Sequence, residues 1–136
     1  MKIKGDIMKL IREIQENYII TKPEDTLKYL NEFKHEDREF FIVLGLDTGN
    51  KVMYREVVSI GTLNSALVHP REVFKGAVLK SANSIIIAHN HPSGKTEASN
   101  EDIQVMETLK SAGNILQIKL LDALIITKDT IISYMD

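Results

Sequence analysis

Cysteine is absent from this chain of 136 residues, and no apolar run approaches the roughly 20 residues that a membrane-spanning helix requires. The missing thiols exclude disulfides, cysteine nucleophiles and cysteine-ligated zinc, so any metal must be held by histidine or carboxylate ligands. Charged residues interrupt the first residues, Met1–Asp6, which therefore lack the apolar segment of a signal peptide. We expect a cytoplasmic protein without membrane contact.

A strong charge of one sign is missing as well. Seventeen Lys and Arg residues face nineteen Asp and Glu residues, for a formal net charge of −2, and the basic residues are scattered along the chain. A DNA-binding domain usually carries a basic stripe, so direct nucleic-acid binding is disfavoured. The length and the 43% hydrophobic content predict one globular domain.

Hydrophobic spacing predicts alternating helices and strands. Residues 6–18 place Ile7, Leu10, Ile11 and Ile14 at helical spacing and predict a short amphipathic helix. Two further helices are expected to begin near Pro23 and at Pro70, the second with an apolar face that includes Val78. A third helix is expected to begin near residue 100 and to end at Ala112, before Gly113 in a left-handed conformation. The predicted strands are a hairpin over 39–60, a buried strand at 84–88, and closing strands at 115–121, 123–128 and 131–135.

The chemistry-bearing pattern is H-x-H-P-x6-S-x2-D, formed by His89, His91, Pro92, Ser99 and Asp102. Two histidines at this spacing at the end of a strand place both imidazoles on one face, which suits two nitrogen ligands on one ion. A carboxylate in the first turn of the next helix can supply a third ligand. Such a set leaves the fourth position open, as in catalytic zinc sites.

Each part of the pattern also has a purely structural interpretation. Two nearby histidines can lie in a loop without any metal. Ser99 and Asp102 have the spacing of a capping box, although its last residue is usually Glu or Gln. The combination favours a metal site.

The pattern is the JAMM motif, and the chain resembles the RadC branch of the JAB/MPN zinc metallopeptidases. Four segments support the likeness, one of them the start of the motif itself: residues 61–64, 69–73, 89–94 and 121–122. The likeness covers about residues 22–136, so we divide the chain into an N-terminal helical extension, 1–21, and a RadC-like JAB/MPN domain, 22–136. The resemblance implies an α/β fold, a curved mixed sheet between helices similar to that of cytidine deaminases.

The resemblance also implies roles for individual residues. His89, His91 and Asp102 would hold Zn²⁺, and Ser99 would donate a hydrogen bond to the oxyanion. A glutamate at the start of the first core strand would act as general base, and Glu39 fits this position better than its rival Glu56. The implied reaction is hydrolysis of an amide or isopeptide bond in a peptide or protein substrate.

The chain departs from the RadC pattern at several points. It is too short for the helix-hairpin-helix segment of the long form, Ala98 replaces a proline before the serine, and Ala123 replaces a histidine. These departures support an alternative: a RadC-type binding or accessory module in DNA repair or mobile-element biology, with a metal site but little turnover. His69 is interpreted as structural or substrate-side. Nuclease and deaminase activities are disfavoured, because the adjacent His-Asn-His letters do not form a nuclease motif and the zinc cysteines of deaminases are missing.

Overall fold

The computed structural model describes residues 11–61 and 68–135. Within them, six strands form one sheet in the order β1-β3-β2-β4-β5-β6. The strands are β1 (Ile11–Glu13), β2 (Phe40–Leu46), β3 (Val52–Ile60), β4 (Ser84–Asn90), β5 (Lys119–Ile126) and β6 (Ile131–Ser133). The helices are η1 (Pro23–Thr26), α2 (Leu27–Leu30), η2 (Asn31–Phe33), α3 (Pro70–Val73), α4 (Lys75–Lys80) and α5 (Asn100–Leu116).

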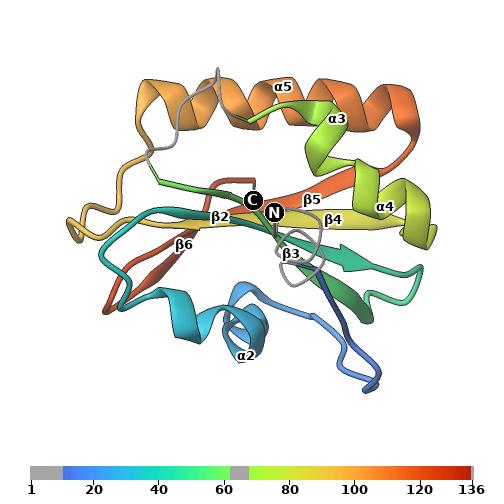
Figure 1. The fold of residues 1–136 in the computed structure, drawn as a ribbon, viewed down its shortest axis with the longest axis horizontal. Helices are drawn as coiled ribbons and strands as arrows, with labels where there is room; N and C mark the ends of the chain where they lie inside the picture. The colour runs from blue at the N-terminus through green and yellow to red at the C-terminus, as the bar shows by residue number, and fades with distance from the viewer. Residues whose placement is uncertain (1–10, 62–67, 136) are drawn as a thin grey trace, which may run out of the picture.

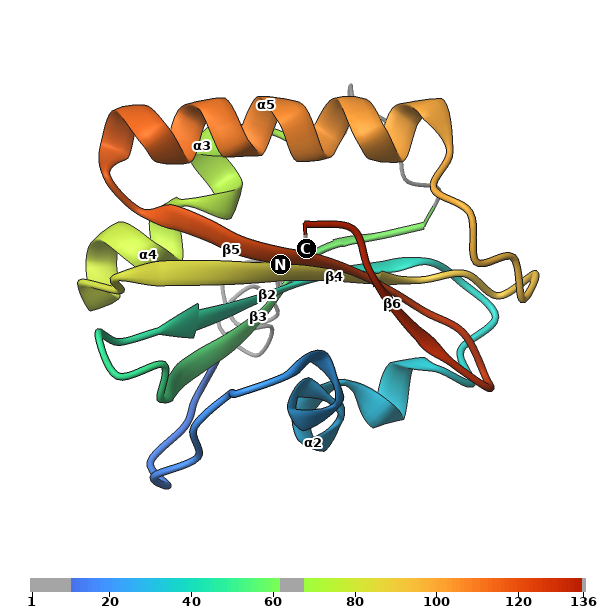
Figure 2. The ribbon, with the colours of Figure 1, turned by 180° about the vertical axis from the view of Figure 1, so that it is seen from behind.

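The sheet is mixed and lies between two helical layers. Only the β4–β5 pair is parallel among the described ladders, and α5 provides the crossover between these two strands. Helices α3, α4 and α5 cover one face, and α2 lies on the other (Figures 1 and 2). The expected α/β architecture, a mixed sheet between helices, is therefore confirmed.

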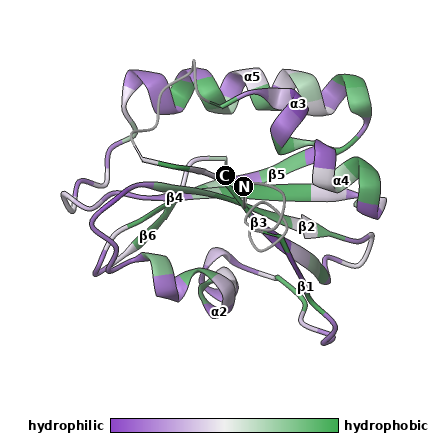
Figure 3. Cartoon of the chain, viewed as in Figure 1, coloured by the Kyte–Doolittle hydropathy of each residue, from purple (hydrophilic) through white to green (hydrophobic). Residues whose placement is uncertain are grey.

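Alternate side chains of the central strands pack into two hydrophobic cores, one on each face of the sheet. Phe41 and Val43 of β2 join the core beneath α3–α5, whereas Ile42 and Leu44 join the core above α2. The predicted hairpin and the buried strand at 84–88 are confirmed as β2–β3 and β4. The middle of both central strands, β2 and β4, is apolar (Figure 3), because both faces of the sheet are covered.

The N-terminal helix prediction is wrong for the residues that the structure describes. Ile11–Glu13 is strand β1, antiparallel to β3, and the chain continues beside β3 as far as an isolated bridge between Ile19 and Lys51. Pairing with the open edge of β3 satisfies the backbone groups of this stretch and outweighs the weak helical periodicity. Ile7 and Leu10 lie outside the described residues.

The C-terminal boundaries also differ from the prediction. Helix α5 extends to Leu116, Gln117 adopts the left-handed conformation (φ 58°), and one strand, β5, replaces the expected pair at 115–121 and 123–128. Gly113 lies inside α5, where a Cβ atom would come within 2.4 Å of the Ile118 carbonyl oxygen. The glycine is thus required by close packing rather than by a positive φ. Val78 is 58% exposed and does not join the core.

None of the described helices is both long enough and apolar enough to cross a membrane.

Candidate metal centre

The end of β4 brings two histidines to one side of the sheet. His89 lies opposite Phe41 in the β2–β4 ladder, and their rings stack with centroids 6.4 Å apart at an interplanar angle of 12°. His91 follows two residues later and faces the same way. Asn90, between them, turns to the other side. Its side chain accepts from Phe40 N (2.7 Å) and donates to Arg38 O (2.8 Å), which fixes the end of β4 against the start of β2.

The carboxylate near the two histidines belongs to Asp102, in the first turn of helix α5. Ser99 is its N-cap and accepts a hydrogen bond from Asp102 N (3.0 Å), while Ser99 N donates to Asp102 Oδ2 (2.8 Å). The capping box is therefore present, with Asp in the place of the usual Glu or Gln. The same box orients Asp102 toward the histidines, so its role in the capping box is compatible with a role as a metal ligand.

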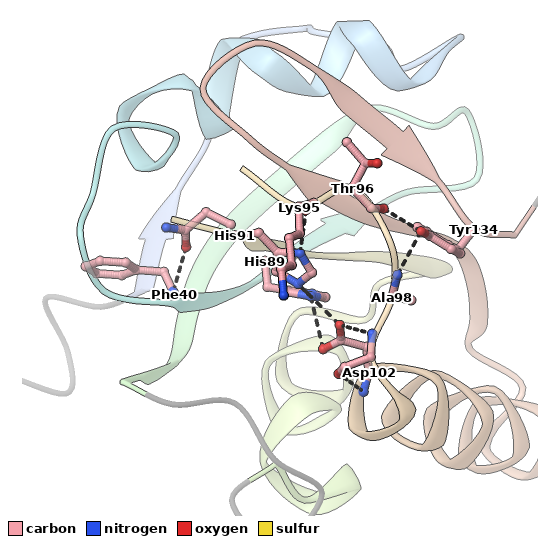
Figure 4. A network of polar contacts seen from close by, with 10 residues as sticks. Phe40, His89, His91, Lys95, Thr96, Ala98, Asp102 and Tyr134 are labelled. Carbon is pink, nitrogen blue, oxygen red and sulfur yellow. Dashed lines mark hydrogen bonds and ion pairs between the residues drawn. The ribbon is translucent and has the colours of Figure 1, made fainter. Parts of the chain in front are cut away.

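Three ligand atoms converge at this point. His89 Nε2 and His91 Nε2 are 2.9 Å apart, and each lies 3.2 Å from a different oxygen of Asp102 (Figure 4). The three side chains are 5%, 10% and 3% exposed. Zinc bound tetrahedrally at 2.0–2.1 Å separates its N and O ligands by about 3.3 Å. The donor set and its spacing therefore fit a zinc-sized ion.

A backbone carbonyl sets the tautomer of His91. Its Nδ1 donates to Lys95 O (2.8 Å), since a carbonyl can only accept. In the neutral ring, Nε2 then carries the lone pair and points into the cluster, as a metal ligand must. Sequence analysis missed Lys95, because a contribution from its main chain leaves no side-chain signal.

The electrostatics of the metal-free cluster favour an ionised carboxylate. Burial opposes the charged form of Asp102, but hydrogen bonds from His89 and His91 outweigh it and hold its pKa well below the usual range. The hydrogen bond to Asp102 in turn raises the pKa of His91, against its own partial burial.

The two glutamates that compete for the role of general base occupy different places. Glu39, half-buried just before β2, lines an open cleft together with Asp37, Arg38, Gly61, Pro92 and Ser93. Its charge contributes to the raised pKa of His91. The cleft thus joins Glu39 to the residues that directly follow the second histidine.

Glu56 lies elsewhere, in the middle of β3. It pairs with Val43, and its Oε1 is buried near the position where a Cβ atom on Gly76 would lie. Burial raises its pKa to about 7; Lys75 opposes this shift and Glu72 adds to it. None of these groups belongs to the histidine cluster.

The remaining predicted residues lie as follows. Ser99 is exposed, and its hydroxyl accepts from Asp102 N, which leaves its own hydrogen available to a substrate oxygen. His69 occupies the N-cap of α3, where its carbonyl, not its ring, accepts the helical hydrogen bonds. Ala123 is 1% exposed in the core beneath α3–α5. Residues 62–64 of the motif at 61–64 lie outside the described part of the chain.

A mixed sheet between helices, with a His-His-Asp cluster at the end of its central strand, defines a JAB-type domain with a candidate metal centre. The sequence model of one protein family, the RadC-like JAB domain, matches residues 20–136 of this chain. The chain belongs to this family, as the motifs predicted.

Curated relatives are similar over most of this chain. A UPF0758 protein of Caldanaerobacter subterraneus is 50% identical over 112 residues, which cover 82% of this chain and 48% of the relative. UPF0758 proteins of Geobacillus kaustophilus and Chlorobaculum parvum are 48% and 45% identical, covering 87% and 88% of this chain and 53% and 54% of theirs. The chain thus spans about half the length of these relatives.

Proposed function

We propose that this domain is a zinc-dependent hydrolase that cleaves an amide or isopeptide bond in a peptide or protein substrate. The observation that carries the proposal is the convergence of His89, His91 and Asp102 within 4.8 Å of one another. Three protein ligands leave one tetrahedral position for water or substrate, which distinguishes catalytic from structural zinc sites. Bound zinc would lower the pKa of a coordinated water and polarise a substrate carbonyl.

The residues of the chain itself supply the proton transfers. Glu39, in the cleft beside Pro92 and Ser93, accepts the proton of the attacking water and returns it to the leaving amine. The new carbon–oxygen bond forms first, which places negative charge on the former carbonyl oxygen, and the carbon–nitrogen bond then breaks as the amine receives the proton. Ser99 donates its free hydroxyl hydrogen to the oxygen that gains charge.

The first experiment measures metal content by mass spectrometry on the purified chain beside His89→Ala. We expect about one zinc per chain in the wild type and none in the variant, because one of three protein ligands is lost. A wild-type chain that takes up no zinc even after supplementation would overturn the hydrolase proposal.

The general base is tested with Glu39→Gln on a panel of peptide and isopeptide substrates. We expect kcat to fall by about 100-fold or more while zinc content stays unchanged, since glutamine cannot accept the proton. Glu56→Gln is the matched control and should retain activity, because Glu56 lies outside the histidine cluster. A zinc-loaded wild type that is inert on every substrate would instead favour the binding-module alternative.

A further inference from the structure

The segment between the second histidine and α5 supports two of the three metal ligands. It runs over residues 92–98 without helix or strand and is largely exposed. Near its middle, the Lys95 carbonyl accepts from His91 Nδ1. At its end, Ser99 orients Asp102 through the capping box. A displacement of this segment would therefore misplace both ligands.

The side chain of Tyr134, near the C-terminus, forms two hydrogen bonds with this segment. The Tyr134 hydroxyl donates to Thr96 O and accepts from Ala98 N at 2.8 Å (Figure 4). Both attachment points lie between Lys95 and Ser99, the two residues that support the ligands. A phenol can make both bonds because its oxygen donates one hydrogen and accepts another.

Tyr134 is itself fastened to the sheet. Its backbone N–H donates to Ala123 O (2.9 Å), directly after strand β6. The next residue, Met135, packs against the core beneath α3–α5, as does Ala98. The hydroxyl therefore connects the exposed segment to the rigid body of the domain.

We infer that Tyr134 is a positioning residue of the metal centre: it fixes the segment 92–98 so that His91 and Asp102 are held ready for the ion. The Ala98 N–H that it engages exists only because this position is not proline, which has no donor. A rigid ring in the main chain would restrict the segment covalently, whereas here a hydrogen-bonded tyrosine restricts it. The inference rests on the proposed metal site but predicts a property of the metal-free chain as well.

The test uses Tyr134→Phe, which keeps the ring and removes the hydroxyl. Hydrogen exchange of the amides of residues 94–99 is measured on the metal-free chain, and zinc affinity by competition with a chelator. We expect exchange and zinc dissociation constant both to rise by about three- to tenfold, the range that the loss of one or two neutral hydrogen bonds gives. Tyr29→Phe is the matched control: it removes the hydroxyl that donates to Glu16 on the opposite side of the sheet, and both quantities should stay at wild-type values.

The outcomes separate this inference from the proposed function. Unchanged exchange and affinity in Tyr134→Phe, with a wild type that binds zinc, would overturn the inference and leave the hydrolase proposal standing. A wild type that binds no zinc would remove the proposed function, and the exchange data alone would then decide whether Tyr134 restrains the segment.

Ala98→Pro sharpens the assignment. In this background Tyr134→Phe should reduce zinc affinity less than it does in the wild-type chain, because the Ala98 N–H is already gone and only the hydrogen bond to Thr96 O remains to be lost. An undiminished effect of Tyr134→Phe would show that the bond to Ala98 N–H contributes nothing to the restraint.

Discussion

Two acidic side chains lie between the sheet and the layer of α3–α5, and they behave in opposite ways. Asp102 is 3% exposed and accepts hydrogen bonds from two imidazoles and a backbone N–H, so its pKa falls. Glu56 is only half-buried, yet its Oε1 finds no hydrogen-bond partner among the described residues, and burial raises its pKa to about 7. Partners, rather than depth of burial, decide which carboxylate stays charged.

The contrast also separates a site from a perturbed residue. A strongly shifted pKa is often taken as a sign of function. Glu56 would qualify by that criterion, but its Oε1 faces Gly76 so closely that a Cβ atom added there would come within 2.8 Å of it and within 3.3 Å of the Tyr54 ring. The centre at Asp102 has converging ligand atoms and an adjoining cleft at Glu39, Pro92 and Ser93. Convergence and access therefore carry more weight than the pKa alone.

The largest expected effect comes from Asp102→Asn. The amide keeps an oxygen for the capping bond from Ser99 N but loses the negative charge and one ligand oxygen. Substitution of residues that only hydrogen-bond to metal ligands already lowers metal affinity by about 10–100-fold. For the loss of a ligand itself we therefore expect zinc affinity to fall by at least about 100-fold. Chelator competition measures it, and Glu56→Gln, the same change at the other carboxylate, should leave affinity unaltered. Equal losses of zinc affinity in both variants would show that Asp102 has no special role in metal binding.

The sequence predicted the convergence of His89, His91 and Asp102 because their spacing has a direct geometric meaning. Two histidines two residues apart at a strand end face one way, and Asp102 three residues after an N-cap lies in the first turn of a helix. What sequence could not supply was the backbone carbonyl of Lys95 and the distant Tyr134. These contacts depend on tertiary placement, which leaves no local pattern.

The fold shows the same division. The buried strands β2 and β4 were predictable from continuous apolar runs, whereas β1 was not, because only its pairing with β3 makes it a strand. The end of α5 was misplaced because Gly113 serves close packing against Ile118, while Gln117 takes the left-handed turn that a glycine would normally occupy.

A smaller effect is expected from Gly45→Ala. Gly45 pairs with Tyr54, and a Cβ atom there would come within 1.9 Å of the Tyr54 ring, which is fully buried beside Glu56. The ring must move, so we expect a loss of about 1–3 kcal/mol in unfolding free energy, measured by urea denaturation, with zinc affinity unchanged. Gly49→Ala in the β2–β3 turn is the control, since its Cβ atom would come no closer than 3.6 Å to Asp47. A loss of zinc binding in Gly45→Ala would mean that the two regions are coupled.

The smallest effect, and the sharpest test of the comparison, is the pH dependence of Glu56→Gln. The folded-state pKa of Glu56, about 7, lies above its ordinary value of 4.5, so the folded chain holds a proton that the unfolded chain has lost. Stability from this group is therefore present below pH 4.5 and is lost as the pH rises through 7. The amide stays neutral at every pH, so the variant should match the wild type near pH 4.5.

At pH 8 the same variant should be more stable than the wild type. The expected gain is about 1–2 kcal/mol after allowance for solvent screening of a partly exposed carboxylate, and it raises Tm by a few degrees. Thermal unfolding is measured at both pH values in the presence of a chelator, so that bound metal does not contribute to the difference in Tm. The neighbouring Lys75, Glu72 and Tyr54 are unchanged in the variant, so a difference between the two pH values reports on Glu56 itself. A variant that is less stable at pH 8 would show that the Glu56 carboxylate is stabilised in its charged form, as Asp102 is, and the contrast between the two acids would be lost.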